Sequence, residues 1–219
     1  MSLQAVIFDM DGTLIDSMPY HAKSWDGFFE SKGMPVTEAD LQEKGHGTLY
    51  DIMPRFFGAD ISPEESYALA MEKEKLFRAL YAPHMKLLPG TREWLALLKS
   101  KNISIAMGTA ADFTNADFTV DTLNIRSYFD TIVTSDLVPE GKPSPAVYLY
   151  TAAKLGIAPE NCLVFEDTFS GVEAGLTAGM KVAAITTMHS AEVWQQKTVH
   201  RIYKDYAEVN FEDLTTLFL

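Results

Sequence analysis

The sequence predicts an α/β protein in which a doubly wound parallel sheet carries an inserted all-helical segment. Short apolar runs of strand length recur along the chain, and from residue 91 onward they alternate with helical patterns. Alternation of this kind requires crossover connections, which make neighbouring strands parallel. Residues 15–85, which follow the first apolar run, show almost only helical periodicity, so we expect them to form a separate domain.

The first strand is predicted at residues 6–8, a run of Val, Ile and Phe without polar alternation. Such a run is typical of a strand buried on both faces of a parallel sheet. It is followed by Asp9 and Asp11, whose side chains would point the same way in an extended chain. Ligands bind α/β sheets at the carboxyl ends of the strands, and close carboxylates repel unless a cation or a shared proton relieves them. The two acids therefore indicate a catalytic or metal site; a structural Asp-x-Asp-Gly turn is the alternative.

The inserted segment begins with a helix that has Pro19 in its first turn and ends before Gly33. A helical insertion directly after a catalytic loop is typical of a lid that excludes water and contacts the substrate. We therefore expect a discontinuous core domain of residues 1–14 and 86–219 and a helical cap domain of residues 15–85. The alternative is a purely structural subdomain.

The remaining elements alternate along the core. We expect strands at 103–107, 131–134, 162–165 and 182–185, and helices at 91–101, 145–155 and 170–178. In a doubly wound sheet the first strand takes the central position. Its carboxyl end then lies at the switch point, where such sheets hold ligands.

Three further groups lie where a phosphoryl-transfer site would need them. Thr109 and Ala110 follow the second strand, so the Thr109 hydroxyl and the adjacent amides could hold phosphate oxygens. Lys142 lies in a loop stiffened by two prolines, and its cation could neutralise a transferring phosphoryl group. Glu166 and Asp167 end another apolar strand and would complete a metal site with the first acidic pair. Taken singly, the threonine also fits a strand-end cap and the lysine a solvated surface position.

The chain resembles the haloacid dehalogenase superfamily in four motifs that occur in the order expected for that family. The motifs are Asp9-Met10-Asp11-Gly12-Thr13, Thr109, Gly141-Lys142-Pro143 and Glu166-Asp167. The branch it most resembles has a helical cap after the first motif, the β-phosphoglucomutase-like group of phosphatases and mutases. The resemblance covers nearly the whole chain and implies a Rossmann-like core.

The resemblance also implies a role for each motif residue. Asp9 would be the nucleophile and Asp11 the general acid and base. The phosphate would be bound by Thr109 and Lys142. The implied Mg²⁺ ligands are Asp9, the carbonyl of Asp11, Asp167 and, directly or through its neighbours, Glu166.

We therefore expect a Mg²⁺-dependent phosphatase that hydrolyses small phosphorylated metabolites, of the sugar-phosphate type, through an aspartyl-phosphate. The first alternative is a β-phosphoglucomutase-like sugar phosphomutase. The mutases that the chain resembles carry a Lys-Gly pair in the cap, followed by an arginine. This chain keeps Lys44 and Gly45 but has Thr48 at the arginine position, which favours the phosphatase. Lys44 and His21, which matches a position facing the site in that group, are the cap residues expected to bind substrate.

A rival from another class is a phospho-aspartate signalling switch, since receiver domains also combine acids, a hydroxyl residue and a lysine in a doubly wound sheet. Such a switch needs neither a proton-transferring acid two residues after the nucleophile nor a helical lid. A dehalogenase is less consistent with the chain, because phosphate binding centred on Lys142 and an acid/base at Asp11 suit phosphoryl chemistry.

The composition limits the partners. The 219 residues carry a net charge of −12, with a pI of about 4.8, which argues against nucleic acid and anionic membranes because both select basic surfaces. No apolar run has the length of a membrane span, and no signal peptide is visible, so we expect a cytoplasmic protein, monomeric or at most a weak dimer. Cys162, the single cysteine, is expected to be a buried and inert thiol.

Overall fold

The computed structural model describes residues 2–45 and 49–219. Backbone contacts divide the chain into two compact units. The core unit consists of Met1–Asp16 and Lys86–Leu219, and the helical unit consists of Ser17–Met85.

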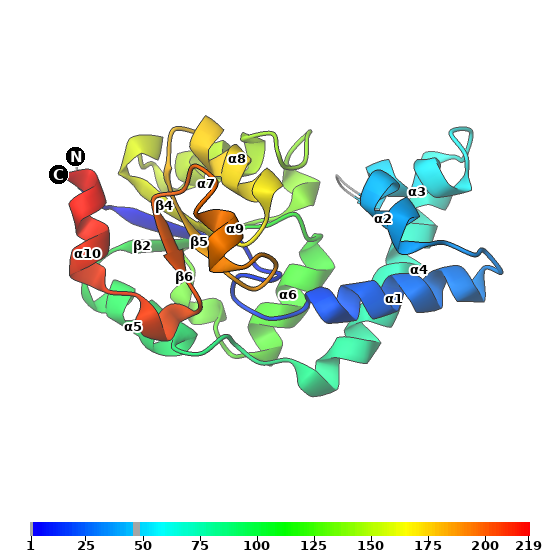
Figure 1. Ribbon diagram of the computed structural model, residues 1–219, viewed down its shortest axis with the longest axis horizontal. Coiled ribbons are helices and arrows are strands. Elements are labelled where there is room, and N and C mark those ends of the chain that lie inside the picture. Colours follow the sequence, from blue (N-terminus) through cyan, green and yellow to red (C-terminus); the bar gives the residue numbers. More distant parts are fainter. Residues whose placement is uncertain (1, 46–48) are drawn as a thin grey trace. The chain divides into compact units, whose positions relative to one another are not determined.

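The core unit is built on a six-stranded sheet with the order β3-β2-β1-β4-β5-β6, and every pairing is parallel (Figure 1). The strands are β1 Ala5–Phe8, β2 Ser104–Gly108, β3 Thr131–Val133, β4 Cys162–Glu166, β5 Lys181–Ile185 and β6 Arg201–Tyr203. The prediction of a doubly wound sheet with the first strand inside it is confirmed. Because the chain extends the sheet to both sides of β1, the carboxyl end of β1 lies at a switch point.

Helices of the core unit alternate with these strands. They are α5 Thr91–Ser100, α6 Phe113–Thr122, α7 Ala146–Leu155, α8 Phe169–Thr177, α9 Ala191–Trp194 and α10 Phe211–Thr215. Short 3₁₀ turns complete the chain: η1 Ala82–His84, η2 Arg126–Tyr128, η3 Ser135–Leu137, η4 Pro159–Asn161, η5 Tyr206–Glu208 and η6 Thr216–Phe218.

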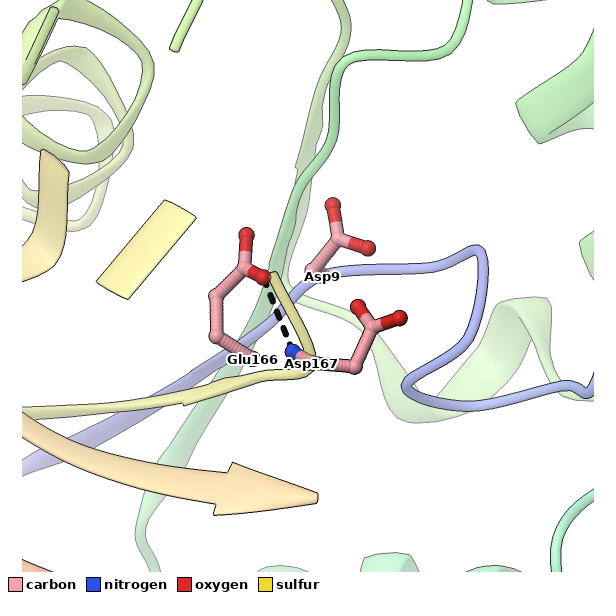
Figure 2. A group of neighbouring side chains, drawn as sticks. All are labelled: Asp9, Glu166 and Asp167. Carbon is pink, nitrogen blue, oxygen red and sulfur yellow. Dashed lines mark hydrogen bonds between the residues drawn. The ribbon is translucent and has the colours of Figure 1, made fainter. Parts of the chain in front are cut away.

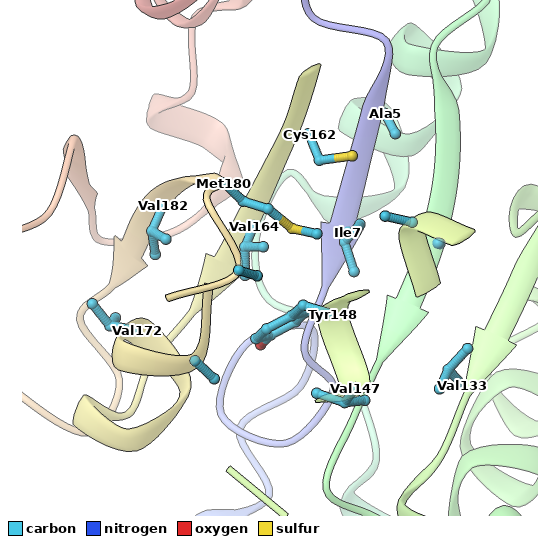
Figure 3. Packing of buried hydrophobic residues seen from close by; sticks show 14 of the residues in the cluster. Ala5, Ile7, Val133, Val147, Tyr148, Cys162, Val164, Val172, Met180 and Val182 are labelled. Atoms are coloured by element: carbon cyan, nitrogen blue, oxygen red, sulfur yellow. The ribbon is translucent and has the colours of Figure 1, made fainter. Parts of the chain in front are cut away.

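The two faces of the sheet are covered by different helices. Ile7 and Val164 point to the face on which Tyr148 and Val172, from α7 and α8, complete one buried cluster (Figure 3). Phe8 and Phe165, one residue further along each strand, point to the other face, where the two rings stack on each other and Phe165 meets Trp94 of α5. This alternation follows from the period of two in extended chain, and it fixes the side on which the next residue of each strand emerges.

Some elements differ from the expectation. The strand and helix bounds agree within about two residues, which is the usual uncertainty of helix and strand ends. Apolar periodicity does not predict α6, because its buried face includes Asn115 and Thr119 beside Ala116 and Val120. It also does not predict β6, because that strand has only three residues and is half-buried at the edge of the sheet.

The described residues of the helical unit form four α-helices, α1 Met18–Ser31, α2 Glu38–Lys44, α3 Leu49–Phe57 and α4 Pro63–Tyr81. Thr37 caps α2, since its side chain accepts a hydrogen bond from the Asp40 amide, and Ser62 caps α4 in the same way through Glu65. Aromatic and aliphatic side chains from three helices form the interior of the unit: Phe28, Phe29, Met53 and Ala70.

None of the described helices is both long enough and apolar enough to cross a membrane. Cys162 is buried at the start of β4, and burial raises the pKa of its thiol to about 12. The expectation of a buried cysteine is confirmed.

Candidate active site

The acidic side chains at the ends of β1 and β4 meet because these strands are neighbours in the sheet. Phe8 pairs with Phe165, so Asp9 comes beside Glu166 and Asp167. Figure 2 shows the three carboxyl groups at these strand ends, and one oxygen from each lies within 4.8 Å of the others. All three side chains are buried. The sequence predicted this convergence from two strand-then-acid patterns.

Lys142 reaches this acidic group from the loop before α7. Its Nζ lies 2.6 Å from Asp9 Oδ1 and 2.5 Å from Glu166 Oε1, and its side chain is 6% exposed. Burial alone would lower the pKa of Lys142, but the charges of Asp9 and Glu166 raise it above its usual value. The lysine is therefore a buried cation and not a solvated surface residue.

Both oxygens of Glu166 are engaged by hydrogen-bond donors. Oε1 accepts from Lys142 and from the hydroxyl of Tyr148, the latter at 2.8 Å. Oε2 accepts from the Asp167 amide and from the amide and hydroxyl of Thr168, at 2.9 to 3.0 Å. Although burial favours the neutral acid, Lys142 and these bonds lower the pKa of Glu166, so its carboxylate is ionised.

Asp167 is bonded differently from its neighbour. Its Oδ1 accepts from the Thr13 hydroxyl at 3.0 Å, whereas Oδ2 is buried and has no partner among the residues that the structure describes. Burial and the nearby charges of Glu166 and Asp9 raise the pKa of Asp167 well above its usual value. Burial, partly opposed by Lys142, also raises the pKa of Asp9. One lysine does not balance the charge of three buried carboxylates.

These features fit a divalent cation. If all three carboxylates were ionised, they and the one ammonium would leave a net charge of −2 in a buried space, which is costly without further positive charge. Carboxylate oxygens are the ligands that Mg²⁺ prefers, and the unpartnered Oδ2 of Asp167 faces no competing donor among the described residues. The donor set of Asp9 and Asp167 therefore suits Mg²⁺ better than that of Glu166, whose oxygens are already bonded.

The turn after β1 is shaped by Gly12. Its φ of +76° lies in the left-handed region, and a Cβ at this position would overlap the carboxylate of Asp167. The Thr187 hydroxyl donates to the Gly12 carbonyl at 2.5 Å, which ties the turn to the loop after β5. Asp11 lies in the same turn, two residues after Asp9, and is half-buried, and its charge adds to the raised pKa of Asp9.

Thr109 lies at the end of β2, the other neighbour of β1 in the sheet. It is buried, its amide donates to Val133, and its hydroxyl oxygen accepts from the Ala111 amide at 3.1 Å. In this bond the hydroxyl acts as an acceptor, so its hydrogen could serve a phosphate oxygen. Ala110 is exposed in the same loop.

The two cap candidates belong to the helical unit. The Nδ1 of His21 lies 2.9 Å from Nζ of Lys73, and its ring stacks on Phe77 at 3.7 Å. His21 is half-buried and packs against side chains of its own unit. Nζ of Lys44 lies 5.6 Å from the ring of Phe56. Contacts of His21 and Lys44 with substrate stay predictions, and Thr48 lies outside the described residues.

Comparison with known proteins identifies the family. The model of the haloacid dehalogenase-like hydrolases matches residues 3–179 of the chain. The chain belongs to this family. The phosphorylated carbohydrates phosphatase of Thermotoga maritima is 36% identical over 187 residues, which cover 82% of this chain and 83% of the relative. The resemblance seen in the four motifs is confirmed.

Solved structures of the same family share the fold. A family IA, variant 3 hydrolase from Entamoeba histolytica matches with a TM-score of 0.88 and 30% identity, covering 98% of this chain and 99% of that one. A β-phosphoglucomutase from Clostridium difficile matches with a TM-score of 0.83 and 25% identity, covering 99% and 97%. The chain therefore has relatives among both phosphatases and mutases.

Tyr148 is a site residue that the motifs did not predict. It lies on α7, six residues after Lys142, in a stretch that reads as an ordinary apolar helix face. Burial and the charge of Glu166 raise the pKa of its phenol well above 10, so the hydroxyl stays protonated and donates. The sequence signal for a role of Tyr148 in the site was its position shortly after the Gly-Lys-Pro triplet. That signal is weak, because buried tyrosines are common in protein cores.

Proposed function

We propose that Asp9 is the nucleophile through which this protein, a phosphatase for small phosphorylated metabolites, hydrolyses its substrates. The proposal is carried by one observation: a buried carboxylate at the switch point of the sheet shares Lys142 with Glu166. Such a carboxylate is fixed in place and partly neutralised, so it can approach an anionic phosphoryl group. A surface acid would be repelled.

Phosphate monoesters hydrolyse so slowly in water that an enzyme must lower the barrier by about 20 kcal/mol or more. In the proposed mechanism Asp9 attacks phosphorus in line with the leaving oxygen and forms an aspartyl-phosphate. Lys142 faces the charge that spreads over the phosphoryl oxygens, and Thr109 donates its hydroxyl to one of them. Water then attacks the aspartyl-phosphate and restores Asp9.

Asp11 is proposed to move the proton. It lies in the turn after β1, near Asp9, and is half-buried, so it can reach both the leaving oxygen and solvent. It would give its proton to the leaving oxygen in the first step and take a proton from the attacking water in the second. A phospho-aspartate signalling switch would need no such proton-transferring group.

Mg²⁺ is the proposed cofactor. Asp9, Asp167 and the carbonyl of Asp11 would hold it, while Glu166 holds Lys142. When bound, the ion supplies positive charge against the phosphoryl oxygens. The support comes from the unpartnered Oδ2 of Asp167 and from the negative charge of the site.

The helical unit is proposed to act as a cap that selects the substrate, with Lys44 and His21 as its contacts. Sugar phosphates are the proposed class, in line with the named activity of the Thermotoga maritima relative. A sugar phosphomutase is the second candidate, favoured by the likeness to the Clostridium difficile protein. We also propose that the protein acts in the cytoplasm as a monomer, away from nucleic acid and membranes, in keeping with its net charge of −12.

The test is release of inorganic phosphate from a panel of sugar phosphates with Mg²⁺, run in parallel with a mutase assay on β-glucose 1-phosphate. Asp9→Asn should keep the fold and lose at least about 99% of the turnover. Residual activity above that level would rule out covalent catalysis by Asp9. Isomerisation of the sugar phosphate without release of phosphate would instead support the mutase activity over the phosphatase activity.

A further inference from the structure

We propose that Tyr148 is a positioning residue that keeps the Lys142 ammonium shared between Glu166 and Asp9. The inference rests on the proposed function, since it concerns the cation that would face the phosphoryl group. It goes beyond that function because Tyr148 belongs to none of the four motifs and would not touch the substrate.

Tyr148 acts on Lys142 in two ways, through Glu166 and directly. Its hydroxyl donates to Glu166 Oε1 at 2.8 Å, and the same oxygen accepts from Lys142 at 2.5 Å. The lysine Nζ also lies 4.9 Å from the centre of the tyrosine ring, within reach of a cation–π attraction. The ring and the hydroxyl of one side chain therefore both act on the ammonium.

The hydroxyl bond alters the balance between two acids that compete for Lys142. Glu166 Oε2 is held by three donors, so the carboxylate cannot rotate and Oε1 is fixed toward the lysine. If Lys142 were the sole donor to Oε1, the ammonium would be drawn toward Glu166. A second donor satisfies part of the charge on that oxygen. Lys142 can then keep its bond to Asp9, where the phosphoryl group would arrive.

The backbone around the ring is shaped for it. Gly108 ends β2 directly before Thr109, and a Cβ there would lie 3.2 Å from the Tyr148 ring and 3.2 Å from Thr151 Oγ1. The missing side chain leaves room for the ring at the strand end. Figure 3 shows Tyr148 among the apolar side chains of this face, and it is fully buried.

Packing alone does not account for the tyrosine. Phenylalanine would fill the same space in this cluster, whereas a buried hydroxyl is unfavourable unless it is bonded. Both Asp9 and Glu166 emerge on the face that α7 covers, because they follow Ile7 and Val164 at a spacing of two. The Tyr148 hydroxyl therefore lies where the apolar cluster of this face meets the carboxyl groups at the strand ends.

The decisive variant is Tyr148→Phe, which keeps the ring and removes only the donor. We would measure kcat and KM with p-nitrophenyl phosphate and Mg²⁺, the inhibition constant of orthovanadate, and Tm. We expect kcat to fall at least about tenfold, KM to stay within about twofold, and orthovanadate to bind correspondingly more weakly. A tenfold loss corresponds to about 1.4 kcal/mol of transition-state stabilisation.

Two matched controls separate this effect from the general loss of a hydroxyl. Tyr150 lies on the same helix, is 37% exposed and has Nζ of Lys154 5.3 Å from its ring, so Tyr150→Phe repeats the change at the surface. Tyr206 is buried, and its hydroxyl has no partner among the described residues, so Tyr206→Phe repeats it in the core. Both should retain kcat within about twofold.

The inference would be overturned if Tyr148→Phe kept the kcat and the orthovanadate inhibition of the wild type. It would also be overturned by a lower Tm with an unchanged kcat, because the hydroxyl would then be purely structural. Should Tyr148→Phe not fold, Gly108→Ala serves instead. Its Cβ would lie 3.2 Å from the Tyr148 ring and crowd it, and retention of wild-type kcat there would equally refute the role. Absence of phosphate release by the wild-type protein would reject the proposed function, and this inference with it. Phosphate release by the wild type, together with an unchanged kcat in Tyr148→Phe, rejects the inference alone.

Discussion

Lys142→Met removes an ammonium that two buried carboxylates share, while keeping most of the side-chain volume. Breaking one partner out of a buried ion pair leaves an uncompensated charge and costs about 3–5 kcal/mol. This cost is expected here before any relief, because Nζ lies within 2.6 Å of carboxylate oxygens of both Asp9 and Glu166. Asp9 can relieve part of the cost by taking up a proton, because burial already raises its pKa. We expect the free energy of unfolding to fall by about 2–4 kcal/mol, which lowers Tm by roughly 4–16 °C.

The same variant tests the chemistry. A preorganised cation aimed at the developing phosphoryl charge is worth about 10²–10³ in kcat. We therefore expect a loss of that size in phosphate release at a temperature well below the Tm of the variant. Unfolding would be followed by circular dichroism, and turnover by inorganic phosphate release at saturating Mg²⁺.

Lys99→Met is the matched control, because Lys99 forms an ion pair with Asp130 at 2.6 Å while both side chains are about 40% exposed. Exposed pairs of this kind contribute at most about 1 kcal/mol. Equal destabilisation by both substitutions would refute the reasoning about burial. A Lys142→Met variant with kcat within about threefold of wild type would refute the proposed role of the cation.

Four further predictions concern other parts of the chain. EDTA should abolish turnover and Mg²⁺ restore it, while Ca²⁺ binds without supporting turnover; full activity in metal-free buffer would reject the metal site. Gly12→Ala should lower Tm more than Gly156→Ala, because both glycines have positive φ but only a Cβ at Gly12 would overlap Asp167; equal shifts in thermal unfolding would contradict this. Lys44→Ala should reduce kcat/KM at least about tenfold for a sugar phosphate and little for p-nitrophenyl phosphate, and equal losses on both substrates would count against a cap contact. Cys162 should react with a thiol reagent only after unfolding, since its pKa is about 12; rapid reaction of the native protein would show the thiol to be accessible.

The sequence was sufficient for features that depend on local patterns and parallel pairing. Apolar runs located the central strands, and acids at the ends of two of them predicted that Asp9, Glu166 and Asp167 would meet. The register between β1 and β4 brings them together, since Phe8 pairs with Phe165. In a parallel sheet, residues that follow neighbouring strands must share an edge, so no knowledge of the side-chain packing was needed.

Features that depend on tertiary partners could not be predicted in this way. On α4 the apolar side chains of Leu69 and Leu76 are only partly buried, whereas Lys73 and Glu74 are almost fully buried. These two form an ion pair at 2.8 Å, and Nζ of Lys73 lies 4.9 Å from the ring of Trp25. Sequence periodicity places charged residues on the solvent-exposed face of a helix, because the sequence does not show the ion-pair partners that would allow them to be buried.

Glu166 and Asp167 show the same limit within the active site. They are adjacent in sequence and were predicted together as metal-site acids. Glu166 accepts five hydrogen bonds and has a lowered pKa, while Asp167 keeps one oxygen without a partner among the described residues and has a raised pKa. Consecutive side chains at a strand end leave in different directions, so one can meet the donors of α7 and the other the turn after β1. The proposed division of labour, in which Glu166 holds Lys142 and Asp167 holds the metal, would therefore arise from the geometry of the strand end, with Tyr148 as the contact that α7 contributes.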